Sequence, residues 1–523
     1  MPSKKTKRTT STRQAAILQN KLLSLENLAK VVNQLKKQGK VVVQCHGVFD
    51  LIHPGHIFHF ESAKKQGDIL VVTVTQDKYV NKGPGRPVFT EDVRAKTIAS
   101  LSVVDYVAIN TRESGTEALL KIRPHVYAKG DEYADESKDI SGGITREREA
   151  AESIGGRLYF TSEPTFSSST LLNKYFNALP SDTKKFMGRF KKQYNISRIT
   201  TDMKKMKSLK VLVIGEAIVD EYHYCFPMGK SAKESIVASK FLKEESFAGG
   251  VLACANHTSD FVKEVKILSV LGKEDSKEEF IRSCLKPNVS SKFILNKDAP
   301  TIVKRRYVWD AFLVKLFEIV FMNEAPISEY VEKKILVFLD KELPKYDLVI
   351  ATDYGHGLFT KAIIDKISKQ SKFLALNVQT NSANIGFNLI TKYPRADYVC
   401  IDHTEMRLAH HDRFGDIRKL VKNTAKQLKA GYVAATLGHQ GSIVWSAKDG
   451  FAETPVLSKE VVDRMGAGDA FLAITAPCVR AGLPPDLVGF IGNTVGALAV
   501  RTIGNRTPIE SLPLMKFMTT LLK

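Results

Sequence analysis

Cysteine is scarce in this sequence, and the few cysteines are not spaced for a metal site. None of them belongs to a Cys-x-x-Cys pair. Such scattering is typical of reduced thiols in a cytosol and argues against a zinc site. We therefore expect a cytoplasmic protein. The cysteines are Cys45, Cys225, Cys254, Cys284, Cys400 and Cys478.

Long hydrophobic runs are also missing. No uninterrupted apolar stretch is long enough to cross a bilayer. The first eight residues are polar and basic, and no apolar core follows them, so the N-terminus does not read as a secretory signal. The sequence predicts no membrane span. A hydrophobic content of 43% and a charged content of 25% are typical of a globular protein.

Acidic residues are too few to balance the basic ones. The 77 Lys and Arg exceed the 56 Asp and Glu, which gives a formal net charge of +21. Such a surface attracts nucleic acid or phosphorylated metabolites, or it is simply solvated. The aromatic–basic interleaving of an RNA-recognition sheet and the spacing of a zinc finger are both absent, which disfavours nucleic acid. The choice between solvation and steering of phosphate ligands stays open.

The chain divides into two α/β segments behind a basic tail. Residues 1–38 hold the tail and a leading helix, 39–177 the first segment, 178–208 a basic linker and 209–523 the second segment. In both segments, strand patterns alternate with helical patterns. This alternation predicts mostly parallel sheets, which bind ligands at the carboxyl ends of their strands.

The first segment carries a histidine-rich turn at residues 45–56. A strand pattern at 41–43 precedes it and a helical pattern at 57–65 follows, which is the context of a phosphate site. The imidazoles of His53 and His56 could stabilise the charge that builds on a nucleotide's α-phosphate. Two surface histidines in a turn are the alternative, but several accompanying residues point to one site. They are Gly47, Phe49, Asp50 and Gly55.

This turn resembles the His-x-Gly-His nucleotidyltransferase superfamily, especially its cytidylyltransferase-like branch, as far as about residue 175. The resemblance implies a Rossmann-like domain. It also implies nucleotide contacts from a basic loop (Lys82 and Arg86) and from the turn at Ser168, Ser169 and Thr170, whose hydroxyls could equally cap a helix. The segment with Lys129 and Asp131 would face a sugar phosphate. Relatives often have Thr-Asn where this chain has Cys45-His46, so a hydroxyl contact at residue 45 is not expected.

The second segment ends in a glycine turn followed by an acid. Gly466, Ala467 and Gly468 precede Asp469 and a helical pattern at 470–479. The exposed N–H groups at such a helix start hold anions. An acid beside the held anion is where a general base for a hydroxyl nucleophile belongs. Alternatively, the motif is a glycine-rich helix entry with an N-terminal acid.

This motif resembles the C-terminal signature of ribokinase-family sugar kinases, and the likeness covers about residues 210–520. It implies that Asp469 deprotonates the sugar hydroxyl while the N–H groups of the turn stabilise the transferring phosphoryl group. It further implies that Glu405 orders Mg²⁺ and its waters, although a solvated acid at a helix start is the alternative reading. The implied sugar-binding residues are Asp220, Gly249, Gly250, Asn256 and Asp353, and the implied ATP-binding residues are Thr436, Gly438, Gly441 and Asn493.

The second segment also departs from its family. The asparagine expected three residues after the glycine pair is Ala253, with Asn256 one turn later, and the loop at 377–380 lacks the usual Asp-Pro. Lys304 and Arg306 could grip the distal phosphate of a sugar phosphate, or they form a plain basic strand edge.

The pairing of the two segments resembles the bacterial bifunctional heptose-7-phosphate kinase/ADP-heptose synthase family, with the domain order reversed. It implies ATP-dependent phosphorylation of a heptose 7-phosphate-like sugar at O1. Nucleotidyl transfer from a nucleoside triphosphate would then give a nucleotide sugar and pyrophosphate. The alternatives are the same two chemistries on another sugar or polyol with CTP, or a scaffold or nucleic-acid-binding protein with inactive folds. Intact Asp469, His53 and His56 argue against a scaffold. We also expect a homo-oligomer.

Overall fold

The computed structural model describes residues 20–80, 86–112, 114–133, 143–161, 180–458 and 460–523. The chain forms two compact units, one of Met1–Pro180 with Met515–Lys523 and the other of Ser181–Leu514. No helix within the described ranges is long and apolar enough to cross a membrane. Lys82 and the turn at Ser168, Ser169 and Thr170 lie outside the described residues.

The first unit contains a six-stranded sheet in which every pairing is parallel. The chain runs from β2 outward to β3 and β4, then returns to add β5 and β6 on the other side of β2. This reversal creates a topological switch point between β2 and β5, where α/β sheets bind ligands. The Rossmann-like prediction is confirmed. The sheet order is β1 (Leu22–Leu23), β4 (Tyr106–Asn110), β3 (Ile69–Thr75), β2 (Val42–Gly47), β5 (Val126–Gly130) and β6 (Arg157–Thr161).

Valine-rich strands bury both faces of this sheet. Val43 and Val72 pack in one core, whereas their neighbours Val42 and Val71 pack in another, because successive strand residues point to opposite faces. The first core includes residues of α3 (Pro54–Lys64) and α4 (Glu91–Ala99). The second includes residues of α2 (Leu25–Lys37) and α5 (Gly115–Ile122). A further helix, α6 (Gly143–Ser153), precedes β6.

The second unit is built on a nine-stranded sheet. The strands from β11 to β17 are parallel, and β18 and β19 continue the sheet antiparallel. The order reverses between β7 and β14, which is therefore the expected ligand edge. In spatial order the strands are β11 (Val289–Asn296), β10 (Glu264–Gly272), β7 (Lys210–Gly215), β14 (Leu348–Asp353), β15 (Leu374–Val378), β16 (Tyr398–Asp402), β17 (Tyr432–Thr436), β18 (Ser442–Ser446) and β19 (Gly450–Thr454).

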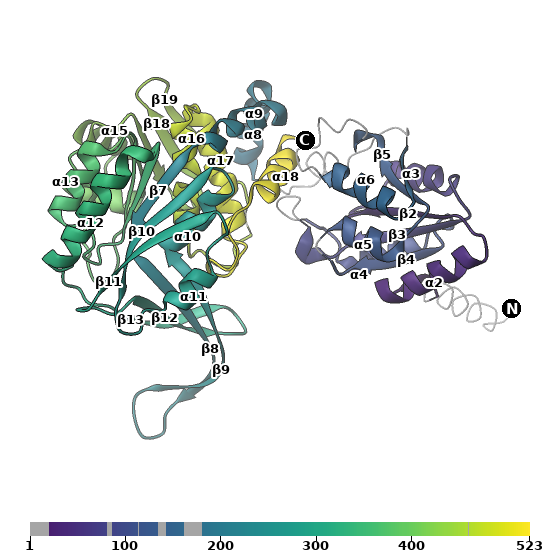
Figure 1. The fold of residues 1–523 in the computed structure, drawn as a ribbon, viewed down its shortest axis with the longest axis horizontal. Coiled ribbons are helices and arrows are strands. Elements are labelled where there is room, and N and C mark those ends of the chain that lie inside the picture. Colours follow the sequence, from purple (N-terminus) through teal and green to yellow (C-terminus); the bar gives the residue numbers. More distant parts are fainter. Residues whose placement is uncertain (1–19, 81–85, 113, 134–142, 162–179, 459) are drawn as a thin grey trace, which may run out of the picture. The chain divides into compact units, whose positions relative to one another are not determined.

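Helices cover both faces of the nine-stranded sheet (Figure 1). On one face α12 (Glu329–Glu342), α13 (Lys361–Gln370) and α15 (Ile417–Leu428) share a core with the strands. On the other face lie α10 (Val251–Ser259), α16 (Ala467–Arg480) and α17 (Pro485–Ala499). All residues from Ala470 to Val479 in α16 are buried, as expected for an apolar helical run at the centre of a layer. The remaining helices are α11 (Glu278–Ser283), α14 (His403–Ala409) and α18 (Ser511–Leu522).

Part of the predicted linker is helical. Residues 181–204 form α8 (Ser181–Gln193) and α9 (Ile196–Lys204), both within the second unit. Phe190 of α8 stacks on Phe490 of α17, with ring centroids 4.3 Å apart. The aromatic contact fixes α8 on the helical layer of this unit.

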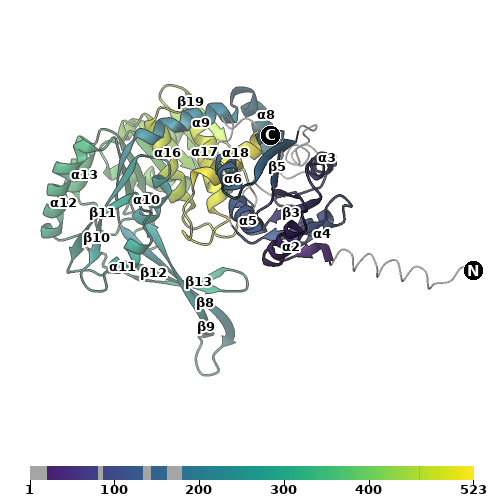
Figure 2. The same ribbon diagram turned by 45° about the vertical axis from the view of Figure 1, so that its right-hand side comes forward.

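A second, four-stranded sheet belongs to the same unit, with the order β13-β12-β8-β9. The long hairpin of β8 (Ala217–Lys230) and β9 (Val237–Gly250) projects away from the main sheet (Figure 2). The first residues of β8 and the last of β9 pair beside the ligand edge, where Gly250 leads directly into α10. The other two strands are β12 (Ile302–Trp309) and β13 (Val314–Phe321).

Candidate active sites

The histidine turn of the first unit lies at the carboxyl end of β2. His53 caps α3, and its ring stacks on that of His56 with centroids 3.9 Å apart. Phe49 meets His56 edge-on at 5.6 Å, and a side chain at Gly47 would come within 3.0 Å of the Phe49 ring. Burial lowers the pKa of His53, which favours its neutral form at neutral pH. The structure thus brings most of the predicted motif together, with Gly55 in the first turn of α3.

The carboxylate of Asp50 contacts the end of the basic loop. Its carboxylate accepts hydrogen bonds from the backbone N–H groups of Val88 at 2.8 Å and Phe89 at 3.2 Å. Arg86 is buried, and burial lowers its pKa although the charge of Asp50 opposes the shift. Asp50 therefore holds the end of the loop in which Lys82 and Arg86 were predicted.

Arg94 is a residue of this site that sequence reasoning missed. It is 1% exposed, and its guanidinium donates to the carbonyl oxygens of Val48, Thr75 and Phe89. It thereby joins the histidine turn, the end of β3 and the basic loop. An arginine in a helical pattern normally indicates an exposed face, so no sequence signal pointed to this role.

Lys129 reaches the switch point but is already paired. Its Nζ lies 2.7 Å from Oε2 of Glu147, whose Oε1 accepts from the hydroxyl of Tyr127 at 3.1 Å. Burial alone would lower the pKa of Lys129, but its interactions with Tyr127 and with the Glu147 carboxylate outweigh burial and raise the pKa. Asp131 is exposed just after β5. Of these two predicted sugar-phosphate residues, only Asp131 faces solvent.

The glycine turn of the second unit opens α16, as predicted. Gly466 is the residue before the helix and has φ +78°, and a Cβ there would lie 2.1 Å from Oδ1 of Asn505. Both the left-handed backbone and this close approach require glycine. The first N–H groups of α16 have no partner within the helix, so they can bind an anion. Asn505 was not anticipated.

Asp469 lies in the first turn of α16 and is poised as a base. Its Oδ1 accepts a hydrogen bond from the hydroxyl of Tyr354 at 2.8 Å. Burial raises the pKa of Asp469 to about 6, the bond from Tyr354 lowers it, and the charge of Asp220 raises it while that of Lys304 lowers it. A pKa near neutrality suits a general base.

Asp220 lies on β8 beside the glycine pair. A Cβ at Gly249 would come within 2.1 Å of Oδ2 of Asp220, so glycine is needed for this approach. The Asp220 carboxylate pairs with the guanidinium of Arg306, which also lies 2.7 Å from Oε2 of Glu318. Arg306 is therefore engaged by two carboxylates.

The side chain of Lys304 differs from that of Arg306 in having no hydrogen bond or ion pair to any residue in the described ranges. It is two residues from Arg306 on β12, so both side chains lie on one face of the strand. Burial lowers the pKa of Lys304, and the charge of Asp220 raises it. This lysine is free to bind an anionic substrate group.

A small, partly open cavity of about 40 Å³ lies at the carboxyl ends of β10 and β11. His356 lines it, and the buried Nε2 of this residue has no hydrogen bond. Burial, and to a smaller extent the charge of Lys304, lower the pKa of His356 to about 4. Polar lining is also supplied by Glu216, Asn296 and Asn323.

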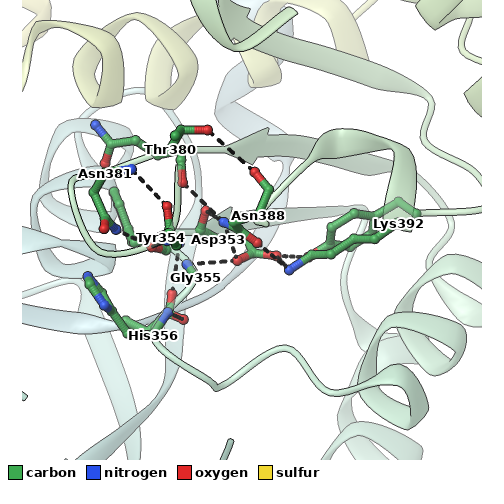
Figure 3. Close-up of polar contacts among 12 residues, drawn as sticks. Asp353, Tyr354, Gly355, His356, Thr380, Asn381, Asn388 and Lys392 are labelled. Atoms are coloured by element: carbon green, nitrogen blue, oxygen red, sulfur yellow. Dashed lines mark hydrogen bonds and ion pairs between the residues drawn. The ribbon is translucent and has the colours of Figure 1, made fainter. Parts of the chain in front are cut away.

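Asp353 was predicted to bind sugar, but its carboxylate is fully engaged inside the protein. It is 0% exposed and accepts from the hydroxyl of Tyr393 at 2.7 Å and from Nδ2 of Asn388 at 3.2 Å. Nζ of Lys392 lies 2.5 Å away, and the N–H of Gly355 donates at 3.0 Å (Figure 3). In the described structure Asp353 anchors the end of β14.

The predicted ATP-binding residues gather around the ends of β17, β18 and β19. Nδ2 of Asn493 donates to the Thr454 carbonyl at 2.7 Å, and a Cβ at Gly441 would lie 2.1 Å from the same oxygen. Thr436 ends β17, and Gly438 begins the turn that follows. Asn256 is placed elsewhere: it donates to the Cys284 carbonyl at 2.9 Å and accepts from the N–H of Lys286 at 3.0 Å.

Glu405 fits an indirect magnesium role better than a direct one. Its Oε2 accepts from the N–H of Asp402 and its Oε1 from that of Thr380, both at 3.0 Å. Burial raises the pKa of Glu405 to about 7. The described residues include no cluster of three or more His, Cys, Asp or Glu that could hold a metal alone. Mg²⁺ usually keeps several waters and binds substrate phosphates, so Glu405 could order it through water.

Comparison with known proteins assigns a family to each part. The model of the pfkB family of carbohydrate kinases matches residues 208–512, which is more than half of the chain. The cytidylyltransferase-like model matches residues 44–174. Both matches agree with the predicted families and with their order along the chain.

Curated relatives match the N-terminal part. "Bifunctional protein HldE" of Desulfatibacillum aliphaticivorans is 34% identical over 154 residues, covering 29% of this chain and 30% of that protein. The protein of the same name from Aliarcobacter butzleri is 39% identical over 121 residues, covering 23% and 25%. The chain thus matches less than a third of the length of these relatives.

Solved sugar kinases resemble the chain more distantly. Ribokinase of Thermotoga maritima is 17% identical with a TM-score of 0.47, covering 59% of this chain and 99% of that one. Phosphofructokinase-2 of Escherichia coli is 13% identical with a TM-score of 0.48, covering 61% and 100%.

Proposed function

The chain belongs to the pfkB family of carbohydrate kinases, and from this premise we propose that its second unit transfers the γ-phosphoryl group of ATP to a sugar hydroxyl. The observation that carries the proposal is the Asp469 carboxylate at the start of α16. Tyr354 holds its Oδ1, whereas its Oδ2 has no hydrogen bond to any described residue. A carboxylate with one unbonded oxygen and a pKa of about 6 is suited to accept the proton of a hydroxyl.

The neighbouring groups supply orientation and charge stabilisation. The N–H groups at Gly466, Ala467 and Gly468 would stabilise the transferring phosphoryl group where α16 begins. Asp220 and the Gly249–Gly250 pair would hold sugar hydroxyls. Mg²⁺, ordered through water by Glu405, would neutralise charge on the ATP phosphates. Thr436, Gly438, Gly441 and Asn493 would surround the nucleotide.

The substrate we propose is a sugar phosphate resembling a heptose 7-phosphate, phosphorylated at O1. Lys304 supports this choice, because its half-buried ammonium has no partner among the described residues. It follows Ile302 by two residues on β12, and Ile302 lines the same cavity as His356. Arg306 is less suited to the distal phosphate because Asp220 and Glu318 already engage it.

For the first unit we propose nucleotidyl transfer to the resulting sugar 1-phosphate. The sugar phosphate would attack the α-phosphate of a nucleoside triphosphate and release pyrophosphate, with His53 and His56 stabilising the developing charge. The stacked pair at the carboxyl end of β2 supports this assignment. ATP is the nucleotide implied by the resemblance to ADP-heptose synthases. CTP, with another sugar or polyol, is the alternative.

We further propose that two copies of the chain associate through the four-stranded sheet in the cytoplasm. Exposed apolar patches of this kind mark interaction surfaces. All six cysteines are unpaired, which suits a reducing compartment. Exposed large apolar residues on this sheet include Phe226, Met228, Val237, Phe241, Val314, Phe317 and Phe321.

A panel assay tests the proposed activities. The full chain is incubated with Mg²⁺, sugar phosphates including a heptose 7-phosphate, and each of ATP, CTP, GTP and UTP, and the products are weighed by mass spectrometry. We expect a sugar bisphosphate and then a nucleotide sugar. Absence of both products, combined with RNA binding that weakens steeply with salt, would replace the enzyme assignment with a nucleic-acid-binding one.

A further inference from the structure

Tyr354 lies directly after β14 and is 2% exposed. Its hydroxyl donates to Oδ1 of Asp469 at 2.8 Å. We propose that Tyr354 is a positioning residue that orients the Asp469 carboxylate so that Oδ2 faces the sugar hydroxyl, and that an asparagine-rich loop at residues 379–388 holds Tyr354 in place. The inference rests on the proposed kinase function.

The backbone of Tyr354 is fixed from two sides. Its N–H donates to Oε2 of Glu216, at the end of β7, at 3.1 Å. Its carbonyl oxygen accepts from Nδ2 of Asn381 at 2.8 Å and from Nδ2 of Asn384 at 3.0 Å. Figure 3 shows the contact between Asn381 and Tyr354. With both peptide groups bonded to side chains, the ring has little freedom to leave Asp469.

The turn around Tyr354 is anchored as firmly as the residue itself. Oε1 of Glu216 accepts from the N–H of His356 at 3.1 Å, so one carboxylate spans the turn. Between these residues, Gly355 has φ +72°, and a Cβ there would lie 2.2 Å from Nδ2 of Asn384. The loop asparagine therefore packs directly on the turn, and only glycine permits this contact.

The same loop also reaches the predicted magnesium side of the site. The N–H of Thr380 donates to Oε1 of Glu405 at 3.0 Å, and the next residue, Asn381, holds Tyr354. A short series of hydrogen bonds thus connects Glu405 to Asp469 through the loop and Tyr354. The loop at 377–380, which lacks the Asp-Pro of the resembled family, has a structural task here.

A buried tyrosine hydroxyl requires an acceptor, so the bond to Asp469 could serve packing alone. The identity of the acceptor, the Asp469 carboxylate, allows a positioning role to be distinguished from packing. Donation to a carboxylate stabilises its ionised form and lowers its pKa, whereas burial of Asp469 raises that pKa. Loss of the hydroxyl should therefore shift the pH dependence of the kinase step, which a loss of packing alone would not do.

The test replaces Tyr354 with phenylalanine in the full chain and measures the phosphorylation of a heptose 7-phosphate by ATP across pH. Tyr354→Phe should lower kcat about tenfold and change KM less than about twofold. The acidic limb, which is the fall of kcat at low pH, should move upward by roughly half to one pH unit because the pKa of Asp469 rises. Wild-type kcat with an unmoved limb would overturn the proposal.

Tyr393→Phe is the matched control. Tyr393 is also a buried tyrosine whose hydroxyl donates to an aspartate, but its acceptor is Asp353, at 2.7 Å. This variant should lose thermal stability without moving the acidic limb. Equal limb shifts in both variants would mean a general structural effect and would overturn the proposal.

Asn381→Leu, which adds no charge near Asp469, provides a second route if Tyr354→Phe does not fold. The substitution keeps the size of the side chain and removes the amide that donates to Tyr354. It should shift the limb in the same direction by a smaller amount, and an unmoved limb would contradict the proposed role of the loop. If the wild-type chain phosphorylates no sugar, the kinase proposal fails. If wild type is active and only the Tyr354 and Asn381 results are negative, the positioning role alone fails.

Discussion

The two candidate sites differ in how many of their charged groups remain free. In the second unit, Oδ2 of Asp469 and the ammonium of Lys304 have no partner among the described residues, although both side chains are partly buried. In the first unit, Lys129 is paired with Glu147, and Asp50 holds the backbone at Val88 and Phe89. The candidate kinase site thus contains charged groups without a protein partner. In the candidate transferase site, Lys129 and Asp50 are bonded to neighbouring parts of the protein.

This difference indicates which groups of each site would contact the substrate. In the proposed mechanism the Asp469 carboxylate and the Lys304 ammonium would each contact one substrate group, so removal of either should affect that group alone. The histidine pair acts within a turn that Asp50 and Arg94 support, so its effect depends on an intact loop framework. Variants that affect only one of the two activities test this difference between the sites.

The largest expected effect is on the transferase. His56→Ala should slow pyrophosphate release from pre-made sugar 1-phosphate roughly 100- to 1,000-fold, because one of the groups that stabilise the developing charge is lost. The kinase rate of the same protein is the internal control. Unchanged pyrophosphate release would remove His56 from the reaction.

A smaller effect is expected at the substrate end of the kinase site. Lys304→Met should raise the KM for the phosphorylated sugar about tenfold, because a charge-assisted contact to the distal phosphate is lost. The same change at Lys292, an exposed lysine on β11, is the matched control. Lys304 would be excluded as the phosphate ligand if the KM for a sugar without the distal phosphate rose equally.

The smallest effect is a difference in pH dependence. Asp469 must be ionised to act as a base, and its pKa is raised to about 6, so the kinase rate should be full above that pH and fall as pH drops through it. The fall should be about tenfold per pH unit at lower pH. Pyrophosphate release, followed in parallel, should lack this limb. A kinase rate that is constant down to pH 4.5 would contradict the assignment of Asp469.

The alternation of strands and helices and the positions of the histidine and glycine turns were predictable because they depend on local patterns. Alternating strand and helix patterns predicted parallel sheets, and the glycines around Asp469 predicted a helix start that holds an anion. The structure adds the physical reason for two of the glycines. Gly249 allows Asp220 to approach, and Gly466 avoids Asn505.

The rest depended on contacts between residues far apart in the chain. The resemblance to sugar kinases implied a sugar-binding role for Asp353, and the structure adds that Asn388, Lys392 and Tyr393 contact its carboxylate. Tyr354 and Arg94 carried no sequence signal, because a tyrosine after a strand and an arginine in a helix usually indicate packing or solvent exposure. The local sequence pattern did not indicate which polar side chains are hydrogen-bonded to other residues of the protein.

The central claim is that one chain holds two separate active sites and that Asp469 is the base of one of them. Asp469→Asn tests it most directly, because the amide keeps the size of the side chain and cannot accept the proton in the same way. The account predicts that sugar phosphorylation is lost, by roughly 100-fold or more, while the same protein releases pyrophosphate from sugar 1-phosphate at the wild-type rate and keeps its melting temperature. Sugar phosphorylation at the wild-type rate in this variant would contradict the account.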